Sequence, residues 1–246
     1  MDRVAEIYTT SVHHHLKPLY ANWEPARPLK LGDYGTLSKG SFNYFGNIAD
    51  MGVEFEVRRS SDTHRRSFAS AGSTTVKLHA KGSAEYVRAA LEIRFSAADA
   101  VFFNATNCRY SMIADKVALG RRILELLRDK AWERRWAVIT DMIHSEATTV
   151  AVSGSDSASL VLEAAEDLPV IDLADASVKL TVGSEERVGY HLIGEKGLTP
   201  LLGLSAIQRA LLRPTGTLEP LGRKSETRPS DEPLFFGELV EPLELA

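Results

Sequence analysis

The chain has 246 residues, of which 44% are hydrophobic and 25% are charged, a composition typical of a soluble globular protein with an ample core. The net charge of −4 gives no general reason to expect nucleic acid as a partner. The single cysteine excludes an internal disulfide framework and is typical of a reducing cytosol. No apolar run approaches the roughly 20 residues of a membrane-spanning helix. The N-terminus lacks the apolar segment of a signal peptide, so we expect a cytoplasmic protein.

The first fifty residues predict a helix followed by short strands. Apolar side chains at helical spacing favour a helix within residues 2–23, and Pro18 should end it. Closely spaced glycines in residues 25–52 indicate tight turns. Their spacing does not match a nucleotide-binding loop, so we interpret this stretch as a small β-meander.

The most informative segment is Tyr86–Met112, which alternates in hydrophobicity over a long distance. It predicts two strands that pair with each other through a turn at Ser96–Asp99. In the first strand, one row is apolar and the other carries Arg88, Glu92 and Arg94. A hairpin of this kind can form part of a one-sided soluble sheet, or it can span a bilayer.

The remaining segments predict loops, one strong helix and more strands. Arg58–Ser73 is rich in serine and arginine and should be a mobile loop. Asp115 is a good N-cap for a helix from Lys116 to about Lys130, with Val117 and Leu119 on its buried face. Trp136–Ile193 should form several separate strands, and Leu198–Leu212 a short strand or turn and then a helix.

These elements predict an α+β fold with a twisted, mostly antiparallel sheet, a few packing helices and a short C-terminal docking tail. We expect a single domain over residues 1–212, and a proline-rich linker with an apolar tail over residues 213–246. The tail is too apolar to prefer water, and it should dock onto the domain or onto a partner. Its apolar side chains are Leu234, Phe235, Phe236, Leu239 and Val240.

A search for catalytic or ligand-binding motifs finds none. There is no nucleophile elbow, zinc-protease motif, paired-cysteine motif or phosphate loop. Cys108 lies in a strand among apolar residues, where a structural thiol is more common than a nucleophile. We therefore predict that the chain is not an enzyme and that it has no cofactor and no metal site.

The order of elements resembles that of the bacterial gasdermins over residues 15–205. Val138–Met142 is similar to a strand of that family that reads valine, aliphatic, threonine, acidic, hydrophobic. Arg27–Leu37 lies where those proteins have an early turn of similar sequence. Bacterial gasdermins typically carry a lipidated cysteine near the start, whereas this chain has no cysteine before Cys108.

The resemblance implies an autoinhibited pore-forming protein of bacterial defence. An activating protease would cut the linker at Arg223, Lys224 or Arg228 and so release the inhibitory tail. The soluble monomer would then contact anionic lipid and become a homo-oligomer at the membrane, with Val53–Met112 and Trp136–Ile193 extending as β-hairpins. The side chains expected to contact lipid are Arg58, Arg59, Arg65 and Arg66.

A second interpretation of the sequence remains open. The chain could be a soluble, non-enzymatic α+β module that acts in binding, immunity or as an adaptor. One face of its sheet would then stay on the core and the other would stay in water. Toxicity of residues 1–222 expressed alone would favour the pore former over this module.

Overall fold

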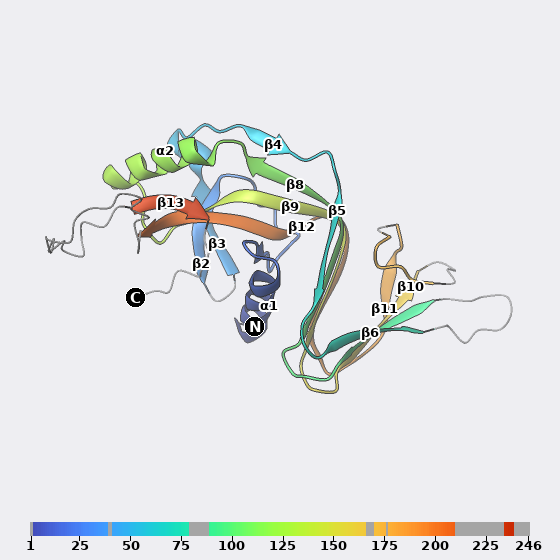
Figure 1. Ribbon diagram of the computed structural model, residues 1–246. Coiled ribbons are helices and arrows are strands. Elements are labelled where there is room, and N and C mark those ends of the chain that lie inside the picture. The colour runs from blue at the N-terminus through green and yellow to red at the C-terminus, as the bar shows by residue number, and fades with distance from the viewer. Residues whose placement is uncertain are drawn as a thin grey trace, which may run out of the picture.

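The computed structural model describes residues 2–38, 41–78, 89–165, 170–175, 177–209 and 234–238 (Figure 1). The helices are α1 (Asp2–His15), α2 (Lys116–Arg128) and the short 3-10 helix η1 (Ile48–Met51). The first six strands are β1 (Tyr20–Ala21), β2 (Asp33–Ser38), β3 (Ser41–Asn47), β4 (Val57–Arg59), β5 (His64–Ala69) and β6 (Ser73–Leu78). They are followed by β7 (Ala90–Phe95), β8 (Val101–Ile113), β9 (Ala137–Ser153), β10 (Ser159–Ala164), β11 (Leu180–Glu186), β12 (Val188–Arg209) and β13 (Leu234–Glu238).

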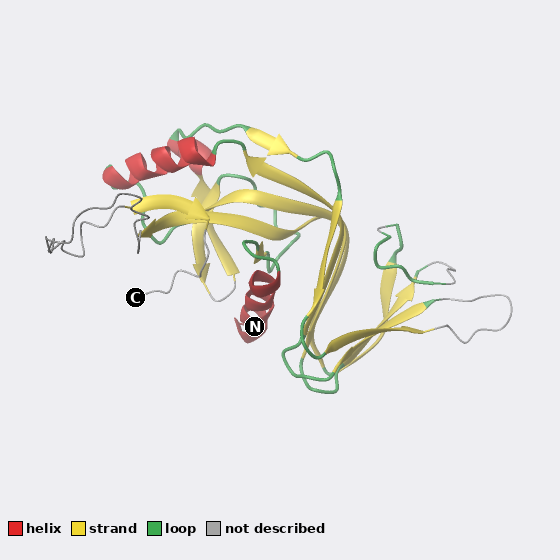
Figure 2. Ribbon diagram, in the orientation of Figure 1, coloured by secondary structure: helices red, strands yellow, loops and turns green. Residues whose placement is uncertain are grey.

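Antiparallel strands dominate the molecule, as Figure 2 shows, and the predicted α+β class is confirmed. The strands form two sheets. The larger sheet is built on the long strands β8, β9 and β12, while β6, β7, β10 and β11 form the smaller sheet. In the described part of the chain, no helix is long and apolar enough to cross a membrane.

The predicted hairpin at Tyr86–Met112 is wrong in its pairing, although both of its strands exist. β7 pairs with β6 and β10, whereas β8 pairs with β4, β5 and β9. The link between them, 96–100, turns the chain out of one sheet into the other instead of back on itself. Ser153 holds this link: its Oγ donates to the Ala97 carbonyl at 2.7 Å and accepts from the Ala100 N–H at 2.9 Å.

Four strands run from the larger sheet into the smaller sheet and form one ribbon that is folded at a sharp bend. In the larger sheet the order is β5, β8, β9, β12, and across the bend their continuations β6, β7, β10, β11 follow in the same order. Backbone hydrogen bonds keep neighbours paired through the bend, from Ser96 to Gly72, from Phe95 to Ala158 and from Gly154 to Arg187. The ribbon therefore consists of two long hairpins, one in which 64–78 pairs with 90–113 and one in which 137–164 pairs with 180–209, each folded over at what we call the second bend.

A first bend lies closer to the helices, where the long strands turn downward near the β5 label in Figure 1. The pairing of β5 with β8 shifts register between His64 and Arg66, and Asn107 of β8 has a positive φ of 48°. In β12 the register shifts between Glu195 and Leu198, close to Gly197 with a φ of 85°. Irregularities of this kind sharpen the local bending of a strand.

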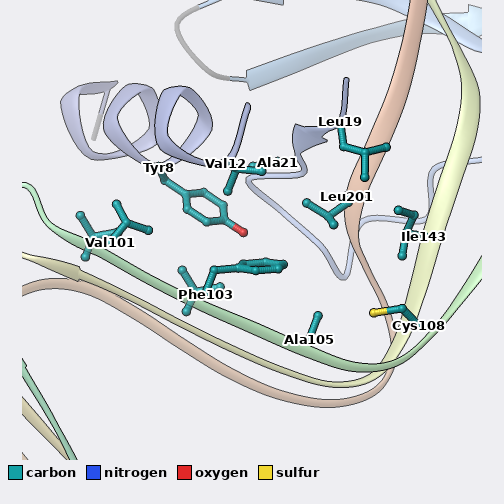
Figure 3. Close-up of a cluster of buried hydrophobic side chains, with 12 residues drawn as sticks. Tyr8, Val12, Leu19, Ala21, Val101, Phe103, Ala105, Cys108, Ile143 and Leu201 are labelled. Carbon is teal, nitrogen blue, oxygen red and sulfur yellow. The ribbon is translucent and has the colours of Figure 1, made fainter. Parts of the chain in front are cut away.

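Helix α1 covers one face of the larger sheet between the two bends. Figure 3 shows Tyr8 and Val12 of the helix above Phe103 and Ala105 of β8, and all four side chains are buried. Burial raises the pKa of the Tyr8 hydroxyl far above its usual value, so the group stays protonated. The helix ends at His15, ahead of Pro18 as predicted.

Helix α2 forms as predicted, and Asp115 caps it by accepting from the Ala118 N–H at 2.8 Å. Leu119, Ile123 and Trp132 are buried against the sheet. Val117, however, was expected on the buried face and is 67% exposed, because it lies on the first turn of the helix on the side facing away from the sheet.

Three other predictions are corrected by the sheet. Arg58–Ser73 is not a mobile loop, because most of it pairs with β8 as β4 and β5. The separate strands expected after Trp136 include a single 17-residue strand, β9. Residues 198–209 continue β12, so no helix begins there, and 210–212 lie outside the described residues. In each case pairing with a long neighbour extends a strand through residues whose local pattern indicates a loop, turn or helix.

Candidate functional site

The candidate functional site is the folded ribbon itself, whose smaller sheet has one polar and one apolar face. On the polar face Arg94 Nε donates to Glu92 Oε2 at 2.7 Å. The alternate residues of β7, Leu91, Ile93 and Phe95, are buried. The row assignment predicted for this strand is thus confirmed for the residues from Ala89 onward, while Arg88 lies outside the described residues.

The apolar faces of both sheets meet inside the second bend. Ile93 and Leu160 of the smaller sheet pack in one cluster with Phe102 and Ala151 of the larger sheet. Each of these four side chains is buried. Burial of apolar area is the main favourable term in folding, so this cluster stabilises the bent form of the ribbon.

The loop between β10 and β11 packs against the apolar residues inside the bend. Its Ile171 is 3% exposed and packs against Leu91 and Ala164 of the smaller sheet. Asn104 of the larger sheet donates from Nδ2 to the Leu173 carbonyl at 2.9 Å. The loop therefore contacts both arms of the bent ribbon and holds them together.

Replacing Ile171 with alanine should lower the free energy of unfolding by about 2–5 kcal/mol, because a buried aliphatic side chain is removed from a packed site. The neighbouring Val170 is 47% exposed, and its replacement with alanine should change stability by no more than about 0.5 kcal/mol. Urea denaturation of both variants measures the difference. Equal, small effects would show that the loop does not stabilise the bend.

The four arginines expected to contact lipid do not form one patch. Arg65 Nε donates to Asn104 Oδ1 at 2.8 Å on the face toward the smaller sheet, whereas Arg66 Nη2 donates to Tyr110 Oη at 2.6 Å on the opposite face. Arg58 and Arg59 are exposed on β4. Successive residues of a strand point to opposite faces, so a run of adjacent arginines divides between the two sides of the sheet.

The tail contributes a strand to the larger sheet. β13 pairs antiparallel with the end of β12, where Ser205 lies opposite Glu238 and Arg209 opposite Leu234. It runs beside α2 (Figure 1). The predicted cleavage positions Arg223, Lys224 and Arg228, and the tail residues Leu239 and Val240, lie outside the described residues.

Two titratable side chains near the first bend are partly or fully removed from water: Cys108 is buried and His144 is half-buried. Burial raises the pKa of the Cys108 thiol to about 11, so the thiol is protonated at neutral pH. Burial, and secondly the charge of Arg59, lower the pKa of His144, whose Nδ1 lies 3.1 Å from Thr199 Oγ1. Within the described ranges, no three His, Cys, Asp or Glu side chains are grouped as metal ligands.

Comparison with known proteins gives little further identification. No family model matches the sequence, and no curated protein matches it. Among solved structures, the chain is similar to the gasdermin A3 membrane pore, with 9% sequence identity and a TM-score of 0.35 over 84% of this chain and 90% of that chain. At that score the likeness is weak and does not establish a family.

Proposed function

We propose that this chain is an autoinhibited pore-forming protein. In this proposal the protein stays in the cytoplasm as a non-enzymatic, soluble monomer until a protease cuts the linker. The ribbon of the released protein then straightens at its second bend on a membrane, and several copies together form a pore.

The observation that carries the proposal is the continuity of the four strands through the second bend. A soluble sheet needs only short strands, commonly five or six residues. Here the paired segments 64–78, 90–113, 137–164 and 180–209 pass through the bend, and each keeps the same neighbours on both sides of it. A transmembrane strand needs about 9–11 residues. The part beyond the first bend, 64–106 and 148–195, is long enough to cross a bilayer once it is straightened.

The two faces of the smaller sheet also suit a pore. In a straightened ribbon, the row of Leu91, Ile93 and Leu160 would face lipid, and the row of Glu92 and Arg94 would face a water-filled lumen, as apolar and polar residues alternate in transmembrane barrels. The apolar row is covered in the folded protein by the contacts inside the second bend.

Oligomerisation would close the sheet. Among the described strands, β6 pairs only with β7 and β11 pairs only with β10, so the smaller sheet has an unpaired edge on each side. Backbone groups at an open edge cannot remain unpaired in hydrocarbon, and a closed barrel is the solution for strands. Each copy can contribute four strands and pair with its neighbours along both edges.

The tail would act as the inhibitor through β13. β13 pairs with the end of β12 and also contacts α2, so it connects the end of the second hairpin to that helix. Expression of residues 1–222 in bacterial cells tests the proposal: these cells should lose viability, and cells that express the whole chain should grow. Normal growth at equal protein levels would favour the soluble binding module.

A further inference from the structure

A cavity of about 330 Å³ lies between the end of α1 and the first bend of the larger sheet. Its volume is in the range of small-molecule sites, about 300–1,000 Å³. Leu16 and Pro18 from the segment after α1 and Leu204 of β12 supply apolar wall, while Arg66 and Lys17 supply positive charge. The cavity thus combines apolar and cationic lining.

Arg66 is the unusual side chain in this cavity. Its Nη2 donates to Tyr110 Oη, and its guanidinium carbon lies 5.6 Å from the centre of the Tyr110 ring. Its Nε is buried and has no hydrogen-bond partner. A buried donor without an acceptor is unfavourable, the more so when the group is charged, so a ligand acceptor that reached this donor would stabilise the side chain.

The other charges in the cavity leave a net positive field. In the described part of the chain, neither Arg66 nor Lys17 has a carboxylate within ion-pairing distance. The one carboxylate in the lining, Asp141, already forms an ion pair with Lys116 at 2.7 Å. His15 lies in the lining as well, with its ring stacked on Phe68 at 4.5 Å.

We propose that this cavity binds a phosphate monoester that carries a short apolar group. The planar guanidinium of Arg66 can donate two parallel hydrogen bonds to phosphate oxygens, and Lys17 adds a second positive charge. Two cations favour the doubly charged phosphate over a singly charged carboxylate, and the apolar wall accommodates the attached group. The ligand is either a free phosphomonoester or the headgroup of an anionic lipid such as phosphatidic acid. The proposal does not rest on pore formation.

Binding of hexyl phosphate to the whole chain, measured by calorimetry and by the shift in melting temperature, tests the proposal. Saturable binding is expected, with inorganic phosphate competing at higher concentration. R66Q should weaken hexyl phosphate binding at least tenfold, because a charge-assisted hydrogen bond to the phosphate is lost. K17Q, at an exposed position, should weaken it less and should leave the fold intact.

R134Q is the matched control, because Arg134 is an exposed arginine outside the cavity; its binding should equal that of the natural chain. Sedimentation with phosphatidic acid vesicles, compared with phosphatidylcholine vesicles, separates the two sources. Sedimentation that R66Q abolishes assigns the lipid headgroup, and binding of hexyl phosphate alone assigns a soluble ligand. Absence of saturable binding, or equal binding by the natural chain, R66Q and K17Q, would overturn the proposal.

Discussion

Purified residues 1–222 should release dye from anionic vesicles at least about tenfold faster than the whole chain, equivalent to an inhibitory free energy of at least ~1.4 kcal/mol. The shortened protein lacks β13, whose pairing with β12 is part of the inhibited form. Fluorescence of an encapsulated, self-quenched dye measures the release.

A synthetic peptide of residues 229–246 is the matched control for this experiment. It contains β13 and should slow dye release when it is added to the shortened protein, because it can restore the pairing along Ser205–Arg209. Equal release by the whole chain and the shortened protein, with no effect of the peptide, would mean that the tail does not inhibit.

Replacing Thr75 with lysine should abolish dye release by residues 1–222. Thr75 is exposed on the edge strand β6 of the folded protein, where a surface substitution should cost no more than about 0.5 kcal/mol. It lies opposite Ile93, in the apolar row. In the inserted state its side chain would face lipid, and a lysine near the bilayer midplane costs about 2–4 kcal/mol, or roughly 30- to 900-fold per copy.

Thr74 provides the control at the next position of the same strand. It is also exposed, but it lies opposite Arg94, in the polar row. T74K would place the new charge in the lumen and should leave dye release nearly unchanged. Thermal melts of both variants check that the folded protein tolerates them. Loss of release in both variants, or in neither, would contradict the assignment of the two rows.

The alternation of apolar residues is the part of the fold that the sequence predicts best. Buried Leu91, Ile93 and Phe95 follow from period-two spacing alone. The pairing of strands cannot be predicted in this way, because alternation shows which face of a strand is buried and not which strand lies beside it. The link 96–100 has the length of a hairpin turn, and only the pairing of β7 and β8 with different strands reveals that it connects two sheets.

The candidate site was predictable in outline. The two extending regions, Val53–Met112 and Trp136–Ile193, contain most of the two hairpins, since long amphipathic strands are visible in the sequence. The second bend was not predictable, because it depends on a loop at Ile171 whose local pattern indicates a turn. Ile171 becomes buried only through packing against the smaller sheet, and the Leu173 carbonyl of the same loop contacts the larger sheet. The cavity at Arg66 likewise requires α1 and the larger sheet to meet, which no local pattern indicates.

The distance between spin labels on the two arms of the ribbon tests the central claim most directly. Cysteines at Ser67 and Thr181, on a Cys108→Ala background, place one label on each side of the second bend. Thr181 lies in register with Leu78 through β10 and β7, and the 11 residues from Ser67 to Leu78 span about 36 Å when extended at ~3.3 Å per residue. The three strand spacings of about 4.8 Å between the two labelled strands add about 14 Å sideways. The whole chain in solution should give one shorter distance, and residues 1–222 on anionic vesicles should give a distance of about 39 Å. An unchanged distance on vesicles that leak would contradict the straightening of the hairpins.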